Sequence, residues 1–192
     1  MINNLETYRL LKQDAERYIN NRYLYISKII RGLFDPRIYN FLCEIGAGEL
    51  ELSKLLIEYY NRIDAYEMFS YSSNTDNNRL KTCGMFRSST DVSVYDLLLS
   101  ICPYCYSYSE DDYFDEEEET KKLIKSIINM SRKNNTGSFI VLPDTKCSKE
   151  IVEEVRDCDD DKSFSVDSIL LHFEKLGVKK TSNNSILIRK CK

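Results

Sequence analysis

Two glycines and two glutamates near the first apolar segment of the chain have the spacing of a ligand site. Gly46 and Gly48 follow an apolar run that ends at Ile45, and a leucine-rich helical pattern begins directly after them. Glycines at such a point allow a sharp strand-to-helix turn and let a ligand approach the backbone. Glu44 lies just before the turn, and Glu67 lies at the end of the next apolar run, roughly 20 residues on, where a ribose-binding acid is found in such folds. The pattern therefore predicts a ligand site at the ends of two strands.

The residues around this turn restrict the kind of ligand. The third glycine of the dinucleotide-binding fingerprint is absent, and Leu50 or Glu51 stands in its place. Glu49 and Glu51 add negative charge beside the helix N-terminus, which would repel a pyrophosphate. A ligand with a ribose and no phosphate, such as S-adenosylmethionine (SAM), fits better. The alternative is a tight turn without a ligand, with Glu67 as an exposed acid at a strand end.

A second motif, Cys102-Pro103-Tyr104-Cys105, has the sequence of the redox tetrapeptide of glutaredoxins. It leaves a thiol oxidoreductase that uses Cys102 as a further alternative. The acidic block at residues 110–119 follows the motif and disfavours the thiolate that such chemistry needs. Two cysteines also form half of a zinc site, but no second pair follows, and the one histidine, His172, lies among apolar residues of a helical pattern. We therefore expect no metal site, and we expect His172 to be packed rather than catalytic.

The elements that would position these residues alternate along the chain. Apolar runs predict strands over residues 38–45, 62–68, 80–84, 92–102 and 138–142. Helical spacing predicts one or two helices over residues 5–34, and further helices after Gly48, around residues 123–128, and near 149–156 and 166–176. Residues 178–180 and 185–191 flank Ser182-Asn183-Asn184, which predicts a hairpin. Alternation of this kind predicts an α/β fold, namely a Rossmann-like, mostly parallel sheet with helices on both faces and a late antiparallel hairpin.

Length and composition limit the number of domains, the cellular location and the state of the cysteines. A chain of 192 residues suits one domain; we expect an N-terminal helical segment at 1–37 and a Rossmann-like core at 38–192. No long apolar run is present, so we expect a cytoplasmic or nuclear protein with no signal peptide, transmembrane segment or membrane partner. The seven cysteines are an odd number and are interpreted as free thiols.

Charge limits the partners. The net charge is −4, so general attraction to nucleic acid is absent. Nucleic acid, with RNA favoured, would need a local basic patch or a protein partner that supplies a basic surface. A small basic cluster is formed by Lys179, Lys180, Arg189, Lys190 and Lys192. The acidic block at 110–119 is interpreted as a solvated loop, with an active-site flap or a docking site for a basic partner as alternatives.

The segment EIGAGELELSKLL at residues 44–56 resembles the first motif of class I SAM-dependent methyltransferases, and most of all the form EIGxGxxxLTxxL of the rRNA adenine dimethyltransferases. The spacing to Tyr66-Glu67-Met68 resembles the second motif of that family. The block at residues 96–104, DLLLSICPY, resembles the fourth motif, of the form DLVxSNPPY. The resemblance covers residues 38–192 and implies a seven-stranded class I methyltransferase sandwich.

The resemblance also implies a cofactor and an activity. SAM would be the cofactor, and the reaction would be methyl transfer to nucleic acid. Glu44, Gly46 and Gly48 would line the methionine end of SAM. Glu67 would hold the ribose hydroxyls, and Met68 would pack on the adenine. Further positions in the aligned motifs are Met85 and Ser100 at the cofactor, and Pro103 and Tyr104 beside the target base.

Two positions depart from the family pattern. Met85 aligns with the acid of the third motif, which takes the adenine amino group. Ile101 aligns with the asparagine of the fourth motif, and an aliphatic side chain cannot polarise a target amine. A catalytically inactive methyltransferase-like subunit, used for protein contact, is therefore the alternative to an active RNA methyltransferase.

Overall fold

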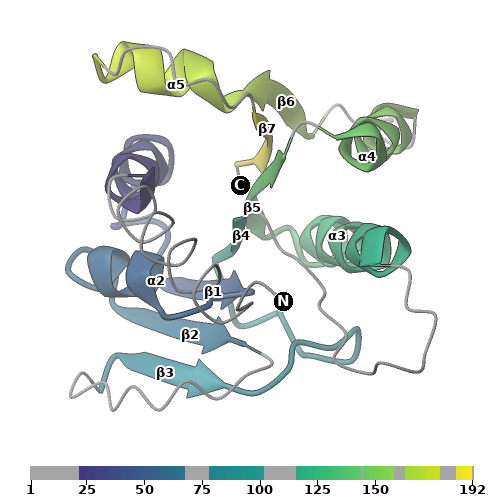
Figure 1. Cartoon of the computed structure of the whole chain (residues 1–192). Helices are drawn as coiled ribbons and strands as arrows, with labels where there is room; N and C mark the ends of the chain where they lie inside the picture. Colours follow the sequence, from purple (N-terminus) through teal and green to yellow (C-terminus); the bar gives the residue numbers. More distant parts are fainter. Residues whose placement is uncertain are drawn as a thin grey trace, which may run out of the picture.

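Seven strands form one mixed sheet in the order β3-β2-β1-β4-β5-β7-β6 (Figure 1). The computed structural model describes residues 22–67, 78–101, 116–143, 145–157, 163–177 and 185–191. The strands are β1 (Phe41–Ile45), β2 (Arg62–Tyr66), β3 (Leu80–Cys83), β4 (Leu97–Ile101), β5 (Gly137–Pro143), β6 (Ser165–Ser168) and β7 (Ser185–Lys190). The first five strands run parallel to one another, whereas β7 is antiparallel to both β5 and β6. The expected Rossmann-like sheet with antiparallel strands at its C-terminal end is confirmed.

Helices cover both faces of the sheet (Figure 1). A helix over residues 22–33, α2 (Glu51–Leu56) and α5 (Ile169–Lys175) lie on one face, and α3 (Glu116–Asn134) and α4 (Lys146–Asp157) lie on the other. The central strands are apolar on both sides, as a parallel sheet between helix layers requires. In β4, Leu97 and Leu99 face the first layer and Leu98 faces the second. Among the described helices, none combines the length and apolar character that a bilayer span needs.

The connection from β3 to β4 contains no helix, and the strand expected over 92–102 begins only at Leu97. Residues 92–96 instead form turns whose apolar side chains are buried, since Val92 and Tyr95 both pack in the core on the α3 side. The carboxylate of Asp96 accepts hydrogen bonds from the backbone N–H groups of Asn40 and Phe41, which fixes the start of β4 beside the start of β1. Burial without strand pairing explains why the apolar run was longer than the strand.

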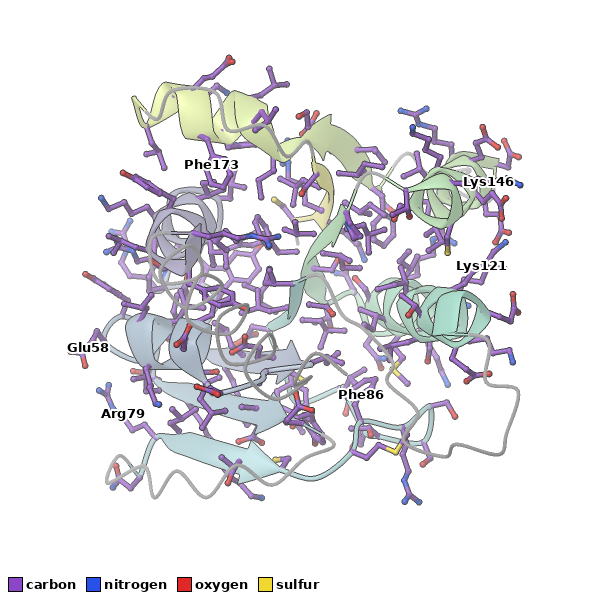
Figure 2. All side chains as sticks on the ribbon, viewed as in Figure 1. Glu58, Arg79, Phe86, Lys121, Lys146 and Phe173 are labelled. Atoms are coloured by element: carbon purple, nitrogen blue, oxygen red, sulfur yellow. The ribbon has the colours of Figure 1, made fainter. Side chains whose placement is uncertain are left out.

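The antiparallel partner of β7 also differs from the predicted segment. The helix expected over 166–176 starts at Ile169, and the four residues before it form β6. Ser168 ends the strand and caps the helix, because its side chain accepts a hydrogen bond from the Leu170 N–H. The predicted turn at 182–184 and the strand at 178–180 lie outside the described residues. Phe173 of α5 packs edge-on against Tyr25 of the N-terminal helix, with 6.2 Å between ring centroids (Figure 2).

Candidate functional site: the loop after β1

The loop after β1 lies at the switch point of the sheet. Strands β2 and β3 follow β1 on one side, and β4 and β5 lie on the other. In open α/β sheets, ligands bind outside the carboxyl ends of the strands at the point where the strand order reverses. The glycines singled out in the sequence therefore occupy the place where this fold binds its ligands.

The loop is held by the end of β2. The N–H groups of Gly46 and Ala47 both donate to the carbonyl oxygen of Tyr66, at 2.9 and 3.1 Å. Gly46 and Gly48 have positive φ angles of 74° and 51°, which glycine adopts without strain. Around Gly48, no atom lies within 4 Å of the position that a Cβ would occupy. The backbone at Gly48 is therefore open to a ligand.

Glu67 and Gly48, two of the predicted ligand residues, are in direct contact. The Gly48 N–H donates to Oε2 of Glu67 at 2.7 Å. Glu67 follows β2 directly, and its own N–H donates to the Cys83 carbonyl oxygen at 3.4 Å. The acid thus lies at the carboxyl edge of the sheet, beside the first loop, as the spacing in the sequence predicts.

Glu44 is buried behind the loop. Its side chain is on the face of β1 that packs on α2, it is only 3% exposed, and its Oε2 accepts a hydrogen bond from the hydroxyl of Ser53. Burial raises the pKa of Glu44 to about 7, and the negative charge of Glu67 acts in the same direction, while the Ser53 hydrogen bonds oppose both. The carboxyl group therefore titrates near neutral pH, and a cationic ligand group close to it would favour the ionised form.

A buried polar network stiffens the end of β2. Tyr95 donates to Asp64 Oδ2 at 3.0 Å, and the Tyr66 and Tyr95 hydroxyl oxygens are 3.1 Å apart. Because Tyr95 has one hydroxyl proton and gives it to Asp64, Tyr66 donates to Tyr95. Arg62 completes the network with an ion pair to Asp64 at 3.1 Å. Phe86, from the β3–β4 connection, packs edge-on against Tyr66 on the α3 side of the sheet (Figure 2). The network fixes the strand whose last carbonyl holds the loop.

Protein-family models and curated proteins give no match to this sequence. Solved structures do. The plantazolicin methyltransferase BpumL in complex with SAH matches with a TM-score of 0.61 at 8% identity, over 97% of this chain and 91% of that one. The N-terminal domain of human METTL16 in complex with SAH matches with a TM-score of 0.55 at 15% identity, over 90% of this chain and 69% of that one. The 23S rRNA methyltransferase ErmE matches with a TM-score of 0.51 at 12% identity, over 87% of this chain and 67% of that one. The chain has the methyltransferase fold.

The remaining predicted cofactor residues take two kinds of position in this methyltransferase fold. Ser100 is fully buried in β4, and its hydroxyl donates to the Ile45 carbonyl oxygen at 3.1 Å. It therefore ties the end of β1 to β4, and its contact with a ligand stays a prediction. Met85 lies two residues beyond β3 and is 57% exposed, so its side chain is accessible at the same edge of the sheet. Met68, Pro103 and Tyr104, together with Cys102 and Cys105, lie outside the described residues.

Ile101 and His172 are buried or half-buried structural residues. Ile101 ends β4, is 6% exposed and packs in the same core as Leu97 and Leu99. His172 is half-buried on α5, with Nε2 at 3.9 Å from Asp167 Oδ2, and burial lowers its pKa. Within the described part of the chain, no group of three His, Cys, Asp or Glu side chains has the arrangement of a metal site.

Sequence reasoning did not single out three residues that build the site. Ser53 holds Glu44, and its signal was its place at the threonine position of the pattern EIGxGxxxLTxxL. Leu50 was named only as a departure from the glycine fingerprint, and its φ of 65° shows that it takes a left-handed conformation directly before α2. Tyr66 acts through its backbone carbonyl, a role that gives no signal in the sequence.

Proposed function

We propose that this protein is a SAM-dependent methyltransferase that acts on nucleic acid, with RNA as the favoured acceptor. The observation that carries the proposal is the contact between Glu67 and Gly48, which brings the ribose acid and the glycine loop together at the switch point of the sheet. Two of the similar structures hold SAH at 15% and 8% identity. ErmE is an rRNA methyltransferase by name and supports the choice of RNA.

The residues present fit SAM by their chemistry. The open backbone at Gly48 admits a ligand. SAM carries no phosphate, so the negative charges of Glu49 and Glu51 beside the loop would not repel it as they would a pyrophosphate. Glu67 would accept hydrogen bonds from ribose hydroxyls, and Glu44 would face the positive amino end of the methionine part. When bound, SAM supplies an electrophilic methyl group on a sulfonium. The chain would contribute orientation of the acceptor for in-line attack, which is worth several kcal/mol without any general base.

Calorimetry with SAM tests the binding part. We expect saturable heat for the whole chain and for Glu58→Ala, a control that removes an exposed glutamate just after α2. Incubation with methyl-labelled SAM and RNA, single-stranded DNA or protein then tests transfer, and we expect label in RNA. An absence of heat at millimolar SAM would contradict the proposal. Label only in DNA or protein would overturn the choice of RNA.

A catalytically inactive methyltransferase-like subunit is the second candidate, and the burial of Ile101 favours it. At the position where the fourth motif has its asparagine, β4 ends in an aliphatic side chain inside the core, which cannot accept a hydrogen bond from a target amine. This candidate predicts SAM binding without labelling of any acceptor by the purified chain. It fails if the chain alone labels RNA.

A further inference from the structure

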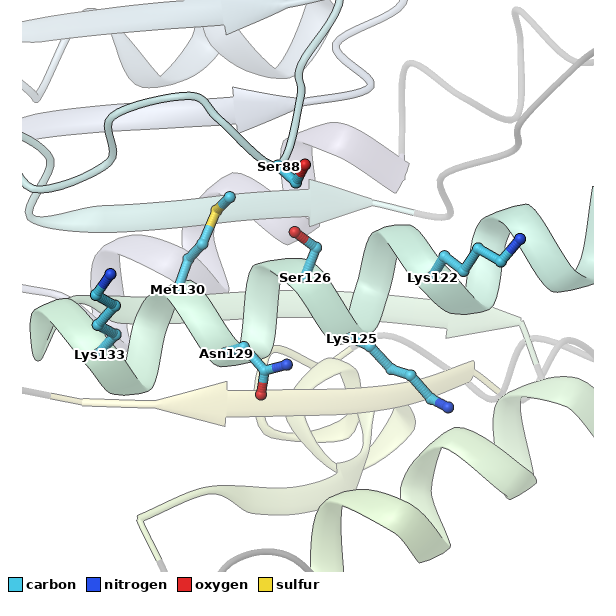
Figure 3. Close-up of a pocket in the computed structure, with 7 residues that line it drawn as sticks. All are labelled: Ser88, Lys122, Lys125, Ser126, Asn129, Met130 and Lys133. Atoms are coloured by element: carbon cyan, nitrogen blue, oxygen red, sulfur yellow. The ribbon is translucent and has the colours of Figure 1, made fainter.

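A shallow groove of about 470 Å³ runs between α3 and the connection from β3 to β4 (Figure 3). Three of its seven lining residues are lysines on α3, and Ser88 closes it from the connection. The polar residues that matter here are Ser88, Lys122, Lys125, Ser126, Asn129 and Lys133. The groove is thus lined by cations, hydroxyls and an amide, and no carboxylate belongs to the lining.

The lysines follow one face of the helix. Residues 122, 125, 126, 129 and 133 are spaced by three or four positions, apart from the adjacent pair 125–126, so their side chains lie on neighbouring ridges. Lys122 and Lys133 are separated along the axis by about 16 Å, at 1.5 Å per residue. A row of this length can contact several consecutive phosphates of an extended strand.

The charges in this row are available to a ligand. Lys122 pairs with Glu119 at 2.7 Å and Lys125 pairs with Glu154 at 2.5 Å, and all four side chains are at least 41% exposed. Exposed pairs of this kind contribute only about 0–1 kcal/mol, so a phosphate can replace the carboxylate at little cost. Lys133 is exposed and makes no ion pair with another residue of the described ranges.

One end of the groove lies toward the carboxyl edge of the sheet. The β3–β4 connection leaves β3 at Cys83, whose carbonyl oxygen accepts the Glu67 N–H, and Ser88 follows five residues later. Helix α3 starts on the carboxyl side of the sheet, after β4, and runs back toward the start of β5. Lys122 therefore lies at the end of the groove nearer the carboxyl edge, and Lys133 lies at the far end (Figure 3).

Of the basic cluster noted at the C-terminus, only Arg189 and Lys190 lie among the described residues, and both are engaged in the fold. Lys190 is only 6% exposed, and its Nζ donates to the Ser131 carbonyl oxygen at 3.0 Å. Arg189 pairs with Asp167 at 3.3 Å. For a chain with a net charge of −4, nucleic-acid binding needs a local patch, and the lysine groove supplies one.

We propose that this groove binds the sugar-phosphate backbone of single-stranded RNA and guides the strand to the site at the end of β1. The inference rests on the proposed function, of which it names the acceptor surface. The lysines would contact phosphates, and Ser88, Ser126 and Asn129 have the donors and acceptors that bond to phosphate and to the 2′-hydroxyl. A volume of about 470 Å³ holds a few groups of one strand.

Fluorescence anisotropy with a labelled single-stranded oligoribonucleotide tests this surface. The variant Lys122→Gln/Lys125→Gln/Lys133→Gln is compared with Lys146→Gln/Lys149→Gln/Lys175→Gln, which removes the same charge from α4 and α5. We expect at least tenfold weaker binding for the groove variant and less than threefold for the control. The plot of log affinity against log salt should also become shallower by about 2 for the groove variant, since each phosphate contact on a single strand contributes about 0.7. Arginine at the three groove positions should restore binding.

The outcomes separate this inference from the proposed function. SAM calorimetry on the groove variant should match that on the unchanged chain, because the three lysines are on α3 and the glycine loop follows β1. If the chain binds RNA through the groove lysines but does not bind SAM, the proposed function is wrong and the proposal of an RNA-binding groove stands. Equal losses in the groove and control variants, no binding of RNA at low salt, or equal binding of single-stranded DNA would each overturn the RNA groove.

Discussion

The carboxylate of Glu67 accepts a hydrogen bond from the backbone N–H of Gly48, at 2.7 Å, and so joins the end of β2 to the loop after β1. The two residues are 19 positions apart in the sequence, and both were predicted there to be ligand residues. In the proposed complex, the same carboxylate would accept hydrogen bonds from ribose hydroxyls beside Gly48.

Removal of this carboxylate should weaken SAM binding. For Glu67→Ala we expect a loss of at least tenfold in affinity, since hydrogen bonds to a charged group contribute about 1.5–3 kcal/mol and a factor of ten corresponds to about 1.4. Glu67→Gln, which keeps an acceptor oxygen and loses the charge, should fall between. Calorimetry with SAM measures both variants, with Glu58→Ala as the control. Unchanged affinity in Glu67→Ala would show that the ribose lies elsewhere.

The contact also shows how far the sequence led. Glycines in a strand-to-helix turn and an acid one strand later are local signals, and the fold then brings them together because parallel strands end at the same edge. Strand β6 could not be inferred from the sequence, since Ser165–Ser168 has only half-buried or exposed positions and no apolar alternation. The turn at 92–96 was missed for the opposite reason, because Val92 and Tyr95 are as buried as strand residues. Burial and strand pairing are different properties, and a hydrophobic pattern reports only the first.

Glu44 should make stability depend on pH. Its pKa is about 7 in the folded chain and about 4.5 when unfolded, so the folded state holds an extra proton between these values. Raising the pH from 4.5 to 7 therefore lowers the free energy of unfolding, by about 3 kcal/mol at 1.36 kcal/mol per pKa unit, and the stability that is present below pH 4.5 is lost as pH rises through 7. Urea denaturation at several pH values measures this slope. In Glu44→Gln the part of the slope due to this group should vanish, and an unchanged slope would show that Glu44 is not its source.

SAM binding should have the opposite pH dependence. A ligand with a positive amino group beside Glu44 favours the ionised carboxylate, so affinity should rise as pH increases through about 7. The dependence should be absent in Glu44→Gln and retained in Glu58→Ala. Calorimetry at pH 6 and 7 measures it, below the range near 7.7–8.0 in which an α-amino group loses its proton. A higher affinity at the lower pH would place the amino group away from Glu44.

Lys190 should stabilise the end of α3. Its buried Nζ donates to the carbonyl oxygen of Ser131 and, at 3.4 Å, to Oδ1 of Asn135, so a cation meets the negative end of the helix. Lys190→Met keeps the apolar stem and removes the charge, and we expect a loss of about 1–3 kcal/mol in urea denaturation. Lys175→Met, at an exposed position in the last turn of α5, should change stability by less than about 0.5 kcal/mol. Equal effects of the two variants would rule out the capping role.

At Leu50, the glycine variant should be more stable than the alanine variant, which is the reverse of the usual order in a helix. It holds a left-handed φ of 65°, yet its side chain is 2% exposed in the core, so it combines a strained backbone with a buried leucine. Leu50→Ala loses the packing and keeps the strain, at about 2–5 kcal/mol, whereas Leu50→Gly loses the packing and relieves about 1 kcal/mol of strain. Leu50→Gly should therefore be the more stable of the two. Leu52, which is 1% exposed and lies within α2, is the matched control, and there glycine should be about 1 kcal/mol less stable than alanine. Urea midpoints for the four variants decide the matter: the same order at both positions would mean that Leu50 is not strained and that the loop does not require a glycine-like residue there.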